Sequence, residues 1–181
     1  MTVPRSIARH PGHIGPKRSP RLARTSAAVV ATAVAGGLGT DVSSRWYRTL
    51  DKPPWQPPGA AFGPAWTTLY ALIALASART LDRLEEPGER RTFATAFGVN
   101  LALNAGWNWL FFTARRPRWA LAEILVLEAS TLDLTRRAAR TDSGAAVMLA
   151  PYAGWVAFAT ALNAAIARLN PGGQPSREGQ P

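Results

Sequence analysis

The chain has 181 residues, no cysteine, two histidines and a formal net charge of +10 at pH 7. This length fits one domain, and the lack of cysteine excludes disulfide scaffolds and thiolate metal sites. Both histidines, His10 and His13, lie near the N-terminus, so the rest of the chain lacks imidazole for acid–base or metal chemistry, and we expect no metal site. The cations lie in the N-terminal region and in short clusters between long uncharged runs, a pattern typical of a membrane protein, so we expect no nucleic-acid partner.

The N-terminal region is basic and rich in proline. Residues 1–24 contain six cations and no acid, which predicts a disordered basic arm. The uncharged run Thr25–Thr40 follows and can be extended through Ser44 as a first membrane helix. A signal peptide cleaved near Ala33-Val34-Ala35 is the alternative interpretation.

The next stretch, WYRTLDKPPWQPPGAAFGPAWTTLY over residues 46–70, combines prolines with aromatic residues. Four prolines between Pro53 and Pro58 fix φ and remove backbone donors, so residues 52–58 are predicted to be an extended connection. The apolar run Phe62–Ala78 follows directly, with Pro64 near its first turn, as expected for a second helix. We therefore expect a rigid aromatic lid that leads into a membrane helix.

Three further runs complete the predicted membrane domain. Thr92–Thr113 contains 22 uncharged residues, which is enough because a helix needs about 20 residues to cross the bilayer core. Trp119–Thr135 is the weakest run, and Ser143–Ala167 is again uncharged. We predict an all-α fold, an integral membrane bundle of five transmembrane helices over residues 25–170, followed by a polar tail over residues 171–181.

The charges in the connections predict an orientation for these five spans. Of the 21 lysines and arginines, 13 lie on the side of the N-terminus and 8 on the other side. The positive-inside rule therefore places the N-terminus in the cytoplasm and the C-terminus outside.

Two rows of residues repeat every four positions in the third span. The amide row is Asn100, Asn104 and Asn108. The small row is Ala94, Gly98, Ala102 and Gly106. The rows are offset by two positions and so lie on nearly opposite helix faces. We expect the amide row to face the bundle interior and the small row to pack against a helix, either of this chain or of a second copy in a homodimer.

Aromatic residues form stripes on three spans. These stripes are Trp66 and Tyr70 in the second span, Trp107 beside Asn104 in the third, and Tyr152, Trp155, Ala159 and Asn163 in the fifth. If they converge, they enclose a cavity for a flat hydrophobic ligand, roofed by Trp55 and its neighbouring prolines. Anchoring at the membrane interface is the alternative for these aromatic residues, and it is the role expected of Trp119.

Three acidic residues interrupt the fourth span. Two have basic residues at helical spacing: Glu123 with Arg116 or Arg118, and Asp133 with Arg136 or Arg137. Glu128 lies in the middle of the span without such a partner. An ionisable group at that depth indicates a functional role, unless the span tilts enough to expose it to water.

Three linked segments resemble one family. WYRTLDKPPWQPPGAAFGPAWTTLY, LALNAGWNWLFF and PYAGWVAFATALNAAIARLN, in that order, are similar to the tryptophan-rich sensory protein and translocator protein (TspO/MBR) family, also called the peripheral-type benzodiazepine receptor family. The resemblance covers residues 46–170. It implies a five-helix membrane bundle, commonly a homodimer, which binds protoporphyrin IX or haem and, in some members, cholesterol or benzodiazepine-type ligands. A bacterial cell membrane is the expected location.

The family places its ligand beneath the proline-rich loop, and the matching positions in this chain are Tyr47, Pro57, Pro58, Trp66, Tyr70, Asn104, Trp107 and Trp155. The spacing argument adds Trp55, Tyr152 and Ala159. Porphyrin is expected as a ligand and no cofactor as an obligatory component. Because the spans lack His and Cys and contain only Met148 as a methionine, the usual axial ligands of haem are not expected, and binding should depend on stacking and shape.

The chain departs from the family pattern at two places. Gly59-Ala60 follows the prolines where an aromatic residue is common, and Ala164 replaces the tyrosine of the sterol-recognition pattern, so cholesterol binding is not supported. Two alternative functions stay open. One is an enzyme that degrades porphyrin oxidatively or in light, with Trp66 and Trp155 as redox-active residues. The other is a structural membrane protein without a small ligand.

Overall fold

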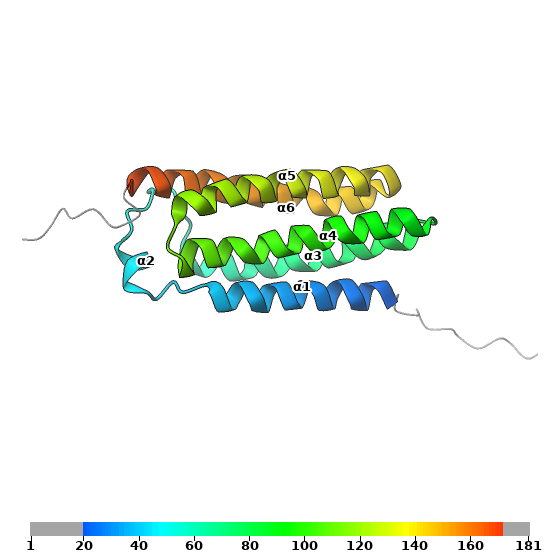
Figure 1. The fold of residues 1–181 in the computed structure, drawn as a ribbon, viewed down its shortest axis with the longest axis horizontal. Helices are drawn as coiled ribbons and strands as arrows, with labels where there is room; N and C mark the ends of the chain where they lie inside the picture. Colours follow the sequence, from blue (N-terminus) through cyan, green and yellow to red (C-terminus); the bar gives the residue numbers. More distant parts are fainter. Residues whose placement is uncertain (1–19, 172–181) are drawn as a thin grey trace, which may run out of the picture.

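The computed structural model describes residues 20–171, and these form a helical bundle without strands. Five long helices lie lengthwise beside one another (Figure 1). They are α1 (Pro20–Gly39), α3 (Phe62–Arg83), α4 (Pro87–Asn108), α5 (Pro117–Thr141) and α6 (Ser143–Leu169). The short elements are α2 (Arg45–Thr49), η1 (Gly59–Ala61) and the π-helical turn η2 (Trp109–Thr113). The predicted all-α fold is confirmed.

The long helices form a closed ring. Helix α1 packs against α3 and α4, α6 packs against α3 and α5, and α4 packs against α5. Short connections join α3 to α4 and α5 to α6, so these neighbours run in opposite directions. The first described residue and the last therefore lie at opposite ends of the bundle (Figure 1).

Local sequence signals explain where several helices begin. Pro87 opens α4 and Pro117 opens α5 at positions that need no backbone donor. Asp142 caps α6 by accepting a hydrogen bond from the Ala145 backbone N–H at 3.2 Å. The lid is extended between Asp51 and Pro58 apart from one turn, as the prolines predict.

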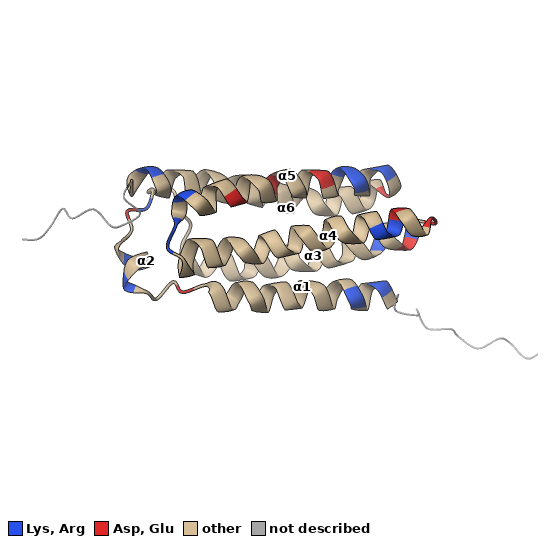
Figure 2. Ribbon diagram, in the orientation of Figure 1, with Lys and Arg blue, Asp and Glu red and all other residues tan. Residues whose placement is uncertain are grey.

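Three helical segments are long and apolar enough to cross a membrane. These are Pro20–Gly39, Gly59–Arg83 and Ser143–Leu169. Helices α4 and α5 do not meet this criterion within the described part of the chain. Charged residues gather toward the two ends of the bundle, whereas α5 also carries acidic residues along its middle (Figure 2). The five-helix bundle is present, and three of its helices have the composition of membrane spans.

Helix α1 begins earlier than the predicted start at Thr25. Its first turns are attached to α3: Arg21 pairs with Asp82 at 3.2 Å, and the Thr25 hydroxyl donates to the Ala74 carbonyl at 2.9 Å. The predicted disordered arm over residues 1–24 is therefore wrong from Pro20 onward. Residues 1–19 of that arm and residues 172–181 of the tail lie outside the described residues.

Candidate functional site

The aromatic stripes of α3 and α6 meet inside the bundle. The ring centroid of Trp66 lies 5.2 Å from that of Tyr70 on the same helix. Across the helix interface it lies 6.4 Å from Tyr152 and 6.2 Å from Trp155, both with edge-to-face geometry. Such pairs stabilise a packed interior by more than their buried area alone.

An uncharged hydrogen-bond chain runs beside these rings and connects four helices. The Tyr70 hydroxyl donates to Asn104 Oδ1 at 2.9 Å, and Asn104 Nδ2 donates to the Tyr152 hydroxyl at 3.1 Å. That hydroxyl donates to Asn100 Oδ1 at 3.1 Å, and Asn100 Nδ2 donates to Thr131 Oγ1 at 3.0 Å. Asn100 and Tyr152 are fully buried. The prediction that the amide row faces the interior is confirmed for Asn100 and Asn104.

Hydrogen bonds and stacking fix Trp107 on the other side of the site. Its indole Nε1 donates to Asn163 Oδ1 at 3.0 Å, and Asn163 Nδ2 donates to the Pro117 carbonyl at 2.8 Å. The indole also stacks on Phe111 with centroids 5.1 Å apart. The indole N–H is thus satisfied, and contacts with α6 and η2 together determine the orientation of the ring.

These aromatic and amide side chains surround a very small void. Its volume is about 20 Å³, roughly the space that one water molecule occupies. The sequence predicts a cavity for a flat ligand, and in the structure the edge-to-face rings fill that space. The lining residues are Trp66, Asn104, Trp107, Ile124, Leu127, Trp155, Val156 and Ala159.

The lid segment, residues 51–61, lies over this end of the bundle without lining the void. Trp55 is 49% exposed and packs edge-on against Phe158, with centroids 6.0 Å apart. Pro57 is half-buried and Pro58 is exposed. These lid residues therefore lie beside the aromatic site but outside its innermost shell.

Tyr47 anchors the start of the lid. Its ring packs against Phe112 at 5.2 Å, and the Lys52 ammonium lies 4.7 Å above the ring centre. The same ammonium donates to the Tyr47 carbonyl at 2.6 Å. Burial raises the pKa of the Tyr47 hydroxyl. Like the prolines, Tyr47 lies near the aromatic site and does not line the void.

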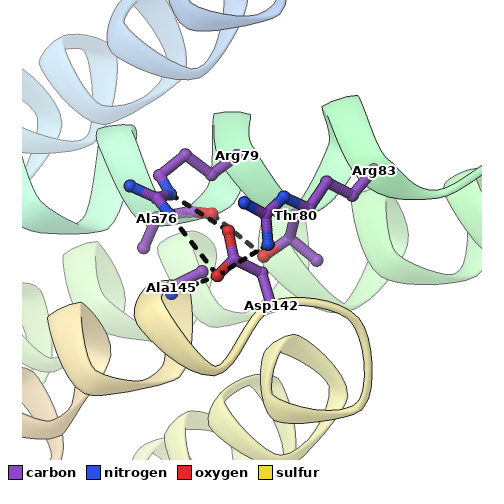
Figure 3. Close-up of polar contacts among 6 residues, drawn as sticks. All are labelled: Ala76, Arg79, Thr80, Arg83, Asp142 and Ala145. Atoms are coloured by element: carbon purple, nitrogen blue, oxygen red, sulfur yellow. Dashed lines mark hydrogen bonds and ion pairs between the residues drawn. The ribbon is translucent and has the colours of Figure 1, made fainter.

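The opposite end of the bundle contains an ion-pair cluster that sequence reasoning missed. The Asp142 side chain, 2% exposed, pairs with Arg79 at 3.0 Å and with Arg83 at 3.1 Å (Figure 3). Hydrogen bonding from Arg79 and the charges of both arginines hold the pKa of this carboxyl below its usual range. Because Arg79 and Asp142 are 63 positions apart, only the helix cap at Asp142 leaves a signal in the sequence.

The three acids of α5 differ in their surroundings. Asp133 accepts a hydrogen bond from Arg137 at 2.6 Å, which confirms one predicted pair. The predicted pair of Glu123 is wrong, because both of its carboxyl oxygens are buried without a hydrogen-bond partner among the described residues. Glu128 lies half-buried, and its Oε2 atom likewise has no partner in that part of the chain.

The small row of α4 faces away from the bundle. Ala94, Gly98 and Ala102 are exposed and Gly106 is half-buried. A Cβ atom added at Gly98 or Gly106 would meet nothing within 4 Å. The row is thus not needed for close packing within the chain, and its role in a homodimer stays a prediction.

Comparisons with known proteins place these features in a family. The sequence model of the TspO/MBR family matches residues 25–169. The chain is 35% identical over 143 residues to the tryptophan-rich protein TspO of Chlorobaculum tepidum, covering 78% of this chain and 90% of that protein. It is 35% identical over 134 residues to the human translocator protein, covering 74% of this chain and 79% of that protein. It is 37% identical over 125 residues to the tryptophan-rich sensory protein of Cereibacter sphaeroides, covering 69% of this chain and 77% of that protein.

Proposed function

The chain belongs to the TspO/MBR family of membrane proteins, and from this premise we propose that it binds a porphyrin, such as protoporphyrin IX or haem, at the aromatic site. We propose further that the chain acts as a sensor, carrier or regulator of tetrapyrrole levels. The names sensory protein and translocator protein of its relatives are compatible with sensing or transport.

The proposed arrangement in the membrane has all five long helices crossing the bilayer. Helices α1, α3 and α6 have the required composition, and α4 and α5 complete the same ring at similar length. The collection of charges toward the two ends supports this arrangement (Figure 2), since charged groups are costly in hydrocarbon. By the distribution of cations, the N-terminus is cytoplasmic and the C-terminus lies outside.

One observation carries the proposal of a porphyrin ligand: tryptophan rings from three helices meet around one void, beside an uncharged hydrogen-bond chain that contains Tyr70 and Tyr152. Indole and phenol rings offer flat apolar faces to a macrocycle. The Tyr70 hydroxyl and the Asn104 amide can hydrogen-bond polar atoms of the ligand. Binding then depends on stacking and shape, so protoporphyrin IX and haem should bind with similar affinity.

The site must open to accept such a ligand. A void of about 20 Å³ cannot hold a macrocycle. We place the opening between Trp66 of α3 and Trp155 of α6, with displacement of the adjacent lid segment. Ring contacts join the two helices there, and these can be exchanged for contacts with the macrocycle. The outward-facing small row of α4 supports a homodimer, in which close helix approach needs small residues.

Quenching of tryptophan fluorescence by protoporphyrin IX tests this proposal on the purified chain in detergent. The double variant Trp66→Phe/Trp155→Phe should weaken the affinity measured by saturable quenching by about tenfold, since it replaces two large indole faces with smaller phenyl rings. Trp119→Phe is the matched control, because Trp119 is 64% exposed and does not line the void. Quenching that does not saturate, or that the folded double variant leaves unchanged, would show partition into micelles and favour a structural role.

A further inference from the structure

A second hollow lies on the outside of the bundle, where η2 meets the beginning of α5. It is a shallow hollow, open to the outside, with a volume of about 410 Å³. Its walls are apolar apart from one cation and one acid. The lining residues are Leu110, Arg116, Trp119, Ala122, Glu123 and Val126.

The two charged residues of this groove lie on the same side of α5. Arg116 precedes the helix, and Glu123 follows seven positions later, which corresponds to two turns and about 10 Å along the axis. Trp119 lies between them and is 64% exposed. A ligand that matches the groove therefore needs an anionic group at one end and a hydrogen-bonding group about two helical turns away.

The carboxyl group of Glu123 is the deep polar point of the groove. Both of its oxygens are buried and lack a hydrogen-bond partner among residues 20–171. A buried polar group without a partner is unfavourable, and native proteins normally supply one. The carboxyl lies beneath the floor of this open groove, so a bound molecule can provide the missing hydrogen bond once the Glu123 side chain turns toward it.

The backbone around the mouth of the groove is unusual. The turn η2 is π-helical, a conformation that is frequent at functional sites. Arg115, two residues further on, has φ of 56°, the one positive value among the described non-glycine residues. Together these features end α4 and direct the chain into Arg116 at the groove's edge.

We propose that this groove binds one anionic phospholipid of the membrane. The Arg116 guanidinium binds the lipid phosphate, for which its planar donors are suited. Trp119 lies at headgroup level, where tryptophan is favoured. An acyl chain covers Ala122 and Val126, and the Glu123 carboxyl, in its protonated form, donates a hydrogen bond to an ester oxygen of the glycerol backbone. The proposal rests on the proposed membrane insertion and does not depend on porphyrin binding.

Charge complementarity favours a lipid over a second copy of the chain. A protein partner would need to supply both an acid for Arg116 and a hydrogen-bonding group for Glu123 at the matching distance. A phospholipid contains a phosphate and ester oxygens in one molecule and is present wherever the chain is inserted.

Native mass spectrometry of the full chain, released from detergent with added phosphatidylglycerol or phosphatidylcholine, tests the role of Arg116. We expect saturable binding of one lipid, with phosphatidylglycerol preferred by about fivefold. Arg116→Gln should remove this preference. Arg118→Gln removes the same charge from a residue outside the groove lining and should retain it. Equal losses in the two variants would overturn the proposal, because they would indicate diffuse attraction to the arginine cluster.

The same experiment tests Glu123 with a conservative pair of substitutions. Glu123→Leu should weaken lipid binding by about fivefold or more, since it removes the hydrogen bond. Glu123→Gln retains a donor and should bind nearly as well as the original chain, and Glu128→Leu serves as the control within α5. Equal lipid binding by all three variants would contradict the proposed site. The site would also be contradicted if the Glu123 substitutions changed the abundance of a dimer and left lipid binding unchanged.

Protoporphyrin IX quenching on the same samples separates this inference from the proposed function. Loss of lipid binding with normal quenching in Arg116→Gln and Glu123→Leu supports an independent groove. Normal lipid binding in a chain that never binds porphyrin leaves the groove in place and removes the proposed function.

Discussion

Helices α3 and α6 are joined at two regions that differ in their chemistry. Toward one end of the bundle, Asp142 at the start of α6 pairs with two arginines of α3 (Figure 3). Toward the other end, Trp66 and Trp155 meet only through ring contacts, next to neutral hydrogen bonds. The comparison shows one end joined by charged groups and the other by ring contacts, and in the proposed function it is the aromatic end that separates around the ligand.

The difference follows from the strength of each kind of contact. A pair of aromatic rings contributes about 0.5–1.5 kcal/mol beyond its burial, and a macrocycle that enters between the rings can replace these contacts. Asp142 is almost fully buried, caps α6 and contacts two guanidinium groups. Separation at that end would leave a desolvated carboxylate without partners, which no apolar ligand could compensate.

The largest effect on stability is expected from Tyr152→Phe in the hydrogen-bond chain. Loss of this hydroxyl leaves one atom each of Asn100 and Asn104 buried without its partner. The free energy of unfolding should fall by about 2–6 kcal/mol, since each of the two unsatisfied groups costs about 1–3 kcal/mol. Reversible unfolding in mixed micelles measures this change in the free energy of unfolding. Tyr70→Phe, which affects one amide oxygen, should cost less, and equal costs would show that the chain does not act as a connected unit.

Filling the void tests whether the ligand enters there. Ala159→Leu adds more volume than the void of about 20 Å³ provides, so we expect a loss of about 1–3 kcal/mol in stability together with about a tenfold weaker affinity for protoporphyrin IX. Ala157→Leu changes an exposed position of the same helix and should leave both quantities unchanged. Undiminished affinity in a folded Ala159→Leu chain would place the porphyrin elsewhere.

Asp142 substitutions should separate the helix cap from the ion pairs. Asp142→Asn retains a capping side chain but removes the charge, whereas Asp142→Ala removes both. We expect thermal midpoints lower by about 2–4 °C for Asn and more for Ala, with protoporphyrin IX affinity unchanged. Weaker binding in Asp142→Asn would contradict the division into two independent regions.

The ion pairs of Asp142 also predict a pH dependence. The pKa of this carboxyl is lowered in the folded chain, so its stabilisation is complete above the unfolded value of about 3.9 and is lost as the pH falls through the folded value. The difference in thermal midpoint between the original chain and Asp142→Asn should therefore be constant near pH 7 and shrink below about pH 4. If the difference does not shrink at all as the pH falls below about 4, its cause is not the charge of Asp142.

Periodicity in the sequence predicts which side chains face inward. Asn100 and Asn104 recur at one turn, as do Trp66 and Tyr70. In the structure the two asparagines are buried, and the two aromatic residues are half-buried and packed against the core. The prolines likewise determine the extended lid. These features depend on the local backbone, and each can be read from a single segment.

Features that depend on contacts between two segments could not be predicted from the periodicity of either segment alone. The closure of the void results from how rings of different helices interlock, and helical spacing within one segment carries no information about it. The Glu123 prediction was wrong because it considered only cations of the same helix, although that carboxyl is buried beside η2. The run Thr92–Thr113 reads as one continuous helix, but its last turn is π-helical.

Distances between spin labels on α3 and α6 test the central claim most directly. Because the chain lacks cysteine, labels can be attached at two introduced pairs of exposed positions, Thr67→Cys/Ala161→Cys toward the lid and Leu75→Cys/Val147→Cys toward Asp142. Protoporphyrin IX should lengthen or broaden the distances of the first pair and leave the second unchanged. If saturating porphyrin changes neither pair, the ligand does not separate the aromatic end of the bundle, and the account is contradicted.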